Sequence, residues 1–121
     1  MQLDGSKIQI DVDANLISEV KKSSAIPAFY GDVDPKLAKT SIELLRPFPI
    51  VSGSQGIGEA WREKHSTYIV CQEDKAIPPE LQYVMAKKAD RIIEWQCGHS
   101  PFLSKPELVI DLLLNLASST D

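Results

Sequence analysis

Three side chains in this sequence are of the types that carry out acyl transfer: Ser54, Asp74 and His99. Ser54 lies in the stretch VSGSQG, residues 51–56, which comes close to the small-x-Ser-x-Gly pattern of a nucleophile elbow. In a Ser-His-Asp system the carboxylate orients the imidazole, and the imidazole takes the proton of the serine hydroxyl. The sequence therefore raises the hypothesis of a hydrolase, provided that the fold brings these groups together.

Two short strands are expected in the C-terminal half, each followed by a helix. Residues 67–71 (TYIVC) form a β-branched and aromatic run typical of a strand buried on both faces. Residues 91–95 (RIIEW) predict a second strand. Helices are expected near 79–88, opened by two prolines, and over 105–117. The order strand, helix, strand, helix predicts an α/β fold with two adjacent parallel strands.

The last of these helices is expected to start with a capping box, in which Ser104 is the N-cap and Glu107 follows three residues later. It is apolar over most of its circumference, which is typical of a heavily buried helix.

The loops after the two strands are QEDKAI and QCGHSPF, and they hold Asp74 and His99. Because the carboxyl ends of parallel strands meet at one edge of a sheet, we expect these two side chains to meet there. Glu73 is the alternative acid. Cys97, two residues before His99, is an alternative nucleophile of thiol type, which we consider the weaker hypothesis because neighbouring loop residues usually point apart.

The N-terminal half gives weaker signals. Residues 7–12 alternate polar and apolar side chains, which predicts a short strand, and residues 14–22 could form a helix with one apolar face. Turns are expected at Pro27 and Gly31. Asp34 then caps a helix whose first residue is Pro35 and which ends before Pro47. Residues 47–58 are rich in Pro, Gly and Ser and are expected to form a connector.

The segments STYIVCQEDKAIPPELQYVMA and CGHSPFLSKPELVIDLLLNLA resemble the C-terminal end of α/β-hydrolases. The resemblance is to the branch that holds plant methyl esterases and hydroxynitrile lyases, and is closer to its bacterial and fungal esterase-like relatives. The stretch FYGDVDPKLAKTSIELLRP is similar to their cap-domain helix. The resemblance covers residues 26–117 and is specific over 66–117.

The resemblance implies that Asp74 is the triad acid and His99 the triad base, in serine acyl transfer without metal or cofactor. It implies that Phe102 lines the substrate pocket, whereas Phe29 and Tyr30 either face the substrate from the cap or pack its helix. Ser54 aligns with the link between cap and sheet, not with the family nucleophile, and Pro47 and Pro49 disfavour the strand that an elbow requires.

The sequence thus matches a partial α/β-hydrolase. Residues 1–58 are interpreted as a cap remnant and connector, and residues 59–121 as a βαβα unit. The nucleophile and oxyanion hole of the family are not recognised in these residues. Without further sheet strands, residues 67–71 are expected to have an open edge and the last helix to be poorly covered. A second copy of the chain or a complementing N-terminal half is the expected partner.

Composition narrows the remaining possibilities. A net charge of −4 and a pI near 5.1, with no stripe of basic residues, argue against nucleic-acid binding. No apolar run reaches the length of a membrane span and the N-terminus lacks a signal-peptide pattern, so a cytoplasmic location is expected. The two cysteines and two histidines have no zinc-site spacing, and Cys71 and Cys97 are expected to be buried near one another.

Two functions follow from this. The favoured hypothesis is a hydrolase of small, largely apolar carboxylic esters in which Asp74 orients His99. The lyase branch is disfavoured, because its members carry a lysine directly after the histidine where this chain has Ser100. The alternative is a non-catalytic protein that binds a small apolar ligand or a partner.

Overall fold

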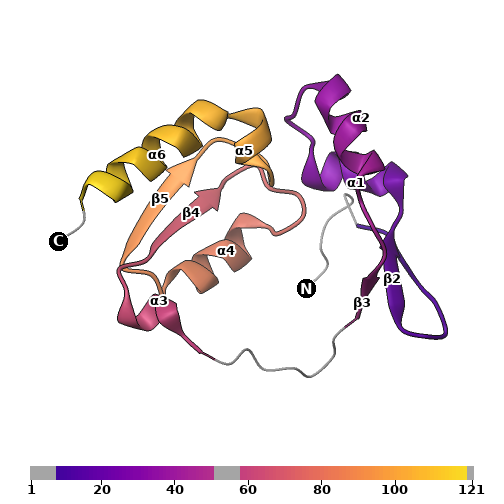
Figure 1. Ribbon diagram of the computed structural model, residues 1–121, viewed down its shortest axis with the longest axis horizontal. Helices are drawn as coiled ribbons and strands as arrows, with labels where there is room; N and C mark the ends of the chain where they lie inside the picture. The colour runs from indigo at the N-terminus through magenta and orange to yellow at the C-terminus, as the bar shows by residue number, and fades with distance from the viewer. Residues whose placement is uncertain (1–7, 51–57, 120–121) are drawn as a thin grey trace.

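The computed structural model describes residues 8–50 and 58–119, which form an N-terminal and a C-terminal part (Figure 1). Ser54 and Lys7 lie outside the described residues. The division at residue 58 stays a prediction. The N-terminal elements are β1 (Ile10–Val12), β2 (Ile17–Val20), α1 (Lys22–Phe29), α2 (Pro35–Glu43) and β3 (Phe48–Pro49). The C-terminal elements are α3 (Ala60–Glu63), β4 (Thr67–Cys71), α4 (Pro79–Ala86), β5 (Arg91–Trp95), α5 (Pro101–Ser104) and α6 (Pro106–Ser118).

The parallel pair expected from the sequence is present with the expected boundaries. β4 and β5 pair in parallel, from Thr67 opposite Arg91 to Cys71 opposite Trp95. α4 and α6 lie on opposite sides of these strands in the view of Figure 1. Burial on both faces of β4 is confirmed only at its carboxyl end, since Val70 and Cys71 are buried and the three residues before them are half-buried.

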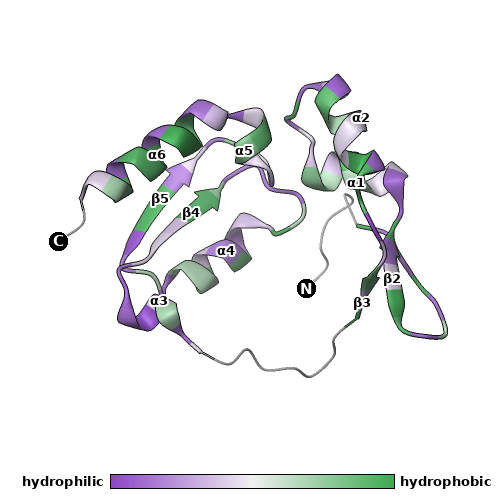
Figure 2. Cartoon of the chain, viewed as in Figure 1, coloured by the Kyte–Doolittle hydropathy of each residue, from purple (hydrophilic) through white to green (hydrophobic). Residues whose placement is uncertain are grey.

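The start and the burial of α6 differ from the expectation. Ser104 ends the separate short helix α5, and its hydroxyl donates to the Ser100 carbonyl oxygen at 3.3 Å, so the predicted capping box is wrong. Lys105 occupies the N-cap position of α6 instead. No described residue of α6 is buried, and Leu113 and Leu114 are 59% and 64% exposed. Figure 2 shows this helix as largely hydrophobic, so its apolar circumference lacks the covering layer that the pattern implied.

The helix predicted over residues 14–22 is wrong. These residues form a turn and then β2, which pairs antiparallel with β1. The carboxylate of Asp13 accepts hydrogen bonds from the amides of Asn15 and Ile17, at 2.8 and 2.9 Å, and so favours a turn over a helix start. Leu16 has a φ of 60°, a left-handed conformation that a helix excludes.

Two predictions that rested on prolines are wrong in this part of the chain. Pro27 lies inside α1 rather than in a turn, and packing that buries Ala25 and Ala28 offsets the hydrogen bond that a proline cannot make. Pro49 lies in β3, which pairs with β2 at the sheet edge, so residues 47–50 are not a plain connector. The predicted start of α2 is confirmed, because the Asp34 carboxylate accepts from the amides of Lys36 and Leu37.

The buried core is built only from small side chains. Among the described residues the buried hydrophobic ones are alanine, valine and cysteine: Ala25, Ala28, Val33, Ala38, Val70, Cys71, Ala86 and Cys97. Leucine and isoleucine side chains of α4, β5 and α6 are exposed in their place. This is the poor covering that the sequence predicts for a partial hydrolase sheet.

Candidate active site

The carboxyl ends of β4 and β5 continue as two loops that stay hydrogen-bonded to each other. The amide of Gln72 donates to the carbonyl of Trp95, and the amide of Glu73 donates to the carbonyl of Cys97, both at 2.9 Å. The parallel ladder therefore extends past the strands. It holds the β4–α4 loop (72–78) beside the β5–α5 loop (96–100), as expected for a functional edge of a parallel sheet.

Asp74 and His99 meet at this edge. The Nδ1 atom of His99 lies 3.0 Å from Oδ2 and 3.2 Å from Oδ1 of Asp74. Asp74 is 8% exposed, whereas 31% of the His99 side chain remains accessible. This arrangement fixes the imidazole through one ring nitrogen and leaves the other, Nε2, for chemistry.

The Asp74 carboxylate has three further donors. Its Oδ1 accepts from the backbone amides of Ala76 and Ile77 at 2.8 and 2.9 Å. Burial by itself raises the pKa of this carboxyl, but the hydrogen bonds from His99 and from the two amides outweigh it and hold the pKa below its ordinary value. Asp74 is therefore a carboxylate at neutral pH. Glu73, the alternative acid, is exposed, and its backbone amide donates to the Cys97 carbonyl.

Gln82 is the third donor, and sequence reasoning noted it only as part of the resemblance. Its side chain, 3% exposed, lies under the end of β4. Oε1 accepts from the Cys71 amide at 2.8 Å, while Nε2 donates to the carbonyls of Cys71 (3.0 Å) and Ile77 (2.7 Å) and to Asp74 Oδ2 at 3.3 Å. A glutamine on the inward face of an otherwise apolar helix was the available signal, because a buried amide needs partners.

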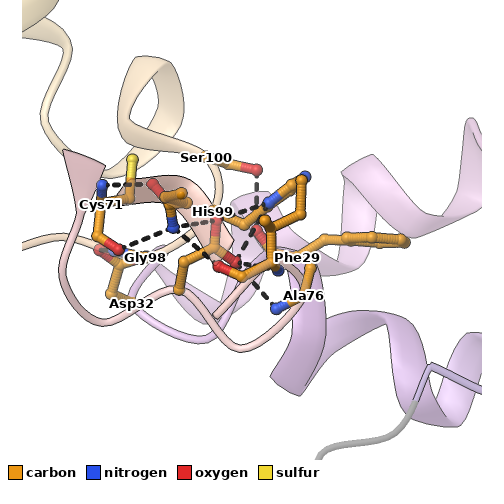
Figure 3. A network of polar contacts seen from close by, with 10 residues as sticks. Phe29, Asp32, Cys71, Ala76, Gly98, His99 and Ser100 are labelled. Atoms are coloured by element: carbon orange, nitrogen blue, oxygen red, sulfur yellow. Dashed lines mark hydrogen bonds and ion pairs between the residues drawn. The ribbon is translucent and has the colours of Figure 1, made fainter. Parts of the chain in front are cut away.

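The last residue of α1, Phe29, and the turn that follows it, residues 30–32, form the other side of the site (Figure 3). The Phe29 ring lies 5.3 Å from the His99 ring, and the Phe29 carbonyl accepts the Ser100 hydroxyl at 2.7 Å. The Asp32 carboxylate accepts the Gly98 amide, also at 2.7 Å. A cavity of about 310 Å³ opens here, between Pro27, Ala28, Gly31 and Asp32 on one side and Glu73, Lys75, Gly98 and His99 on the other.

The remaining candidates, Tyr30 and Phe102, do not line this cavity. Tyr30 packs edge-on against Phe29, with ring centroids 6.0 Å apart, and does not line the cavity. Phe102 is 60% exposed and does not line it either. The side chain of His65 is fully exposed, 3.7 Å from Asp90, at the amino end of β4 and away from the site as expected.

The two thiols are buried neighbours, as expected. Cys71 and Cys97 are free, and both are buried. Burial and the neighbouring thiol raise the pKa of Cys97 to about 12. Since the thiolate is the reactive form of cysteine, this thiol is poorly suited to act as a nucleophile. In residues 8–50 and 58–119, moreover, no three His, Cys, Asp or Glu side chains are grouped so as to hold a metal ion.

Comparison with known proteins identifies the family of this chain. Residues 7–112 match the family described as the alpha/beta hydrolase family. The chain belongs to the alpha/beta hydrolase family. An alpha/beta hydrolase of Aspergillus novofumigatus, nvfD, is 38% identical over 92 residues, which are 73% of this chain and 37% of that protein. The resemblance seen in the sequence is thereby confirmed at the level of the family.

Two solved structures share the fold. The crystal structure of polyneuridine aldehyde esterase has a TM-score of 0.74 at 18% identity, covering 92% of this chain and 48% of that one. A histidine-to-alanine variant of the same enzyme has a TM-score of 0.70, covering 91% and 48%. The chain thus spans less than half the length of the proteins it matches. No helix in the described part of it is both long and apolar enough to cross a membrane.

Proposed function

We propose that this alpha/beta hydrolase chain supplies the acid–base pair of a carboxylic ester hydrolase, with His99 as the base and Asp74 as its orienting carboxylate. The observation that carries the proposal is the 3.0 Å contact between His99 Nδ1 and the buried Asp74 carboxylate. A carboxylate in this place fixes the proton on Nδ1 and stabilises the imidazolium that forms during the reaction.

The proposed reaction is serine acyl transfer. His99 Nε2 takes the proton of a serine hydroxyl as the serine oxygen attacks the ester carbonyl, and it returns that proton to the alcohol as the carbon–oxygen bond breaks. A water molecule then attacks the acyl-serine while Nε2 takes its proton and passes it to the leaving serine oxygen. The acid is released and the serine is restored, so the cycle uses one water and requires no metal or cofactor.

The proposed substrates are esters of a small, largely apolar acid or alcohol. The side chains of Pro27 and Ala28 supply an apolar wall to the cavity, and the Phe29 ring packs against the His99 imidazole without lining it. The lyase alternative is less favoured because of the residue after His99. Ser100 is 2% exposed and its hydroxyl donates a hydrogen bond to the Phe29 carbonyl. A lysine at this position would not keep this hydrogen bond. Its charged amine would also have to lie outside the buried place, because an unpaired buried charge is costly.

The serine is proposed to come from outside the described residues. Among residues 8–50 and 58–119, no serine hydroxyl is hydrogen-bonded to the His99 ring; Ser100 is committed to the Phe29 carbonyl. Ser54 is outside this range, and we retain the interpretation that it belongs to a connector. A complementing N-terminal half of the hydrolase fold, or a second copy of the chain, is therefore the proposed partner.

A non-catalytic binding protein is the second candidate. It is favoured by one observation: the described core buries no leucine, isoleucine, phenylalanine or methionine, so large apolar surfaces are available to a ligand or partner. In this case the cavity beside His99 would bind a small apolar ligand without turning it over.

The acid–base pair is tested in the chain itself by nitrogen-15 NMR of the two histidines. We expect His99 to show a slowly exchanging Nδ1–H signal that Asp74→Asn weakens or abolishes, since an amide cannot replace the charge of the carboxylate. The exposed His65 is the internal control and should not change. A His99 signal that Asp74→Asn leaves unaltered would contradict the pairing.

Turnover is tested with p-nitrophenyl acetate and butyrate. The matched segment of the Aspergillus relative is replaced by residues 26–117 of this chain, and hydrolysis by this chimera is expected to require both His99 and Asp74. An active chimera that keeps its activity as His99→Ala contradicts the proposed role. The chain alone is expected to show no turnover, and turnover lost in Ser54→Ala would show that our interpretation of Ser54 is wrong.

A further inference from the structure

The loop that carries His99 is held from two directions. Contacts from the core act on Cys97, whose carbonyl accepts the Glu73 amide, and on the His99 ring, which meets Asp74. Contacts from residues 29–32 act on the residues immediately before and after the histidine, Gly98 and Ser100. His99 is therefore flanked on both sides by bonds to a segment that lies more than sixty residues earlier in the chain.

We propose that Asp32 is a positioning residue for His99: by accepting the Gly98 amide, it fixes the β5–α5 loop where the imidazole reaches Asp74. This inference rests on the proposed function, because the position of the imidazole matters only if His99 transfers the proton. The hydrogen bond of Asp32 goes to the Gly98 amide and not to the His99 ring. Its effect on the ring is therefore transmitted through the backbone of Gly98.

The contact between Asp32 and the Gly98 amide depends on the glycine at position 98. A Cβ atom placed on Gly98 would lie 2.6 Å from Asp32 Oδ1 and 3.0 Å from its Cγ atom, so the Asp32 carboxylate would have to shift. Gly98 is not among the described residues with positive φ, so its backbone conformation does not require glycine. The glycine is explained by space: only a residue without a side chain lets the Asp32 carboxylate reach the amide.

The contact acts as a hydrogen bond more than as a charge. Asp32 is exposed, and water and salt screen the field of an exposed carboxylate at the imidazole. The Gly98 amide, by contrast, belongs to a buried residue and has Asp32 as its hydrogen-bond acceptor. A buried amide that loses its acceptor destabilises the loop that contains it. Asparagine, which offers an oxygen of the same reach without charge, should therefore replace Asp32, and alanine should not.

The test uses the nitrogen-15-labelled chain and its Asp32→Ala and Asp32→Asn variants. In Asp32→Ala we expect the Gly98 amide to exchange with solvent about tenfold faster and the His99 Nδ1–H signal to be lost by exchange. In Asp32→Asn both should be retained. A purely structural role in joining α1 to α2 would not move the imidazole signal, so this signal separates positioning from support.

Asp34→Ala is the matched control. It removes a carboxylate two residues away that accepts from the amides of Lys36 and Leu37 and caps α2, not the β5–α5 loop. We expect a less stable α2 with an unchanged His99 signal. Ser100→Ala removes the second bond to residues 29–32 and should weaken the same signal that Asp32→Ala abolishes.

The outcomes separate this inference from the proposed function. If Asp74→Asn abolishes the Nδ1–H signal and Asp32→Ala retains it, the role of Asp32 is refuted and the acid–base pair stands. If Asp74→Asn leaves the signal in place, the pair itself fails. Should Asp32→Ala unfold, Gly98→Ala decides, because it displaces the carboxylate without removing it; an unchanged Gly98 exchange rate and an unchanged His99 signal would then overturn the proposal.

Discussion

Replacing Gln82 should destabilise the chain more than any other single polar substitution outside the Asp74–His99 pair. The change to test is Gln82→Met, which keeps the length and volume of the side chain and removes its hydrogen bonds. Three of these bonds are 3.0 Å or shorter: those to the Cys71 amide, the Cys71 carbonyl and the Ile77 carbonyl. They tie the last residue of β4 to α4 and to the loop that carries Asp74.

The magnitude follows from these contacts. Each of the three bonds contributes about 1 kcal/mol net, and the Cys71 amide, left without an acceptor in a buried place, adds roughly 1 kcal/mol more. The expected loss is therefore about 4 kcal/mol of unfolding free energy. That is a large share of the roughly 5–15 kcal/mol that a domain possesses. With a core of small side chains, little else compensates for it.

Urea unfolding followed by the fluorescence of Trp61 and Trp95 measures the loss, and Tyr83→Phe is the matched control on the same helix. The Tyr83 hydroxyl also makes two hydrogen bonds, with Gln72 and Glu94, but in an exposed place. Its removal should cost no more than about 0.5 kcal/mol. The reasoning is refuted if Gln82→Met loses no more stability than Tyr83→Phe.

Gln82→Glu extends the same argument to pH. It keeps the shape but places a second carboxylate where Nε2 lies 3.3 Å from Asp74 and 2.7 Å from a carbonyl oxygen. Such a group is driven to stay protonated in the folded chain, so its pKa is raised on folding. The stability of this variant should be greatest in acid and fall as the pH rises, the opposite of the original chain.

Three further predictions concern other parts of the molecule. The pKa of Asp74 is lowered on folding from an ordinary value of 3.8, so its contribution to stability is present above that pH and is lost as the pH falls through the folded value; acid titration of Asp74→Asn should show a shallower loss. Cys97 should resist Ellman's reagent in the folded chain and react in urea, because the thiol is buried and its pKa is raised to about 12. Leu113→Lys should change the unfolding free energy by less than about 0.5 kcal/mol, since the side chain is 59% exposed. It should nevertheless reduce self-association in sedimentation velocity, because a second copy of the chain is one of the proposed partners and the leucines of α6 are exposed apolar surface.

The C-terminal elements could be predicted from the sequence because their local and global signals agree. The run TYIVC favours a strand by propensity. Its parallel pairing with RIIEW brings the carboxyl ends of both strands to one edge of the sheet, where Asp74 and His99 meet. The structure of residues 13–30 was harder to predict, because a few side-chain contacts determine it. The carboxylate of Asp13 favours a turn, and Pro27 is tolerated in a helix whose packing offsets the lost bond. Neither effect has a periodicity that a pattern could reveal.

The site shows the same limit in its outer contacts. Asp74 and His99 could be identified from the sequence, since their types and loop positions are those of an acid–base pair. Asp32 and Gln82 do not, because each acts through backbone groups whose partners are set by folding alone. The imidazole is nevertheless placed by both: Gln82 fixes the end of β4 beneath Asp74, and Asp32 fixes the loop beside His99. The pair therefore depends on both parts of the chain, and a change in residues 29–32 should alter the histidine as surely as a change in the strands that carry the loops.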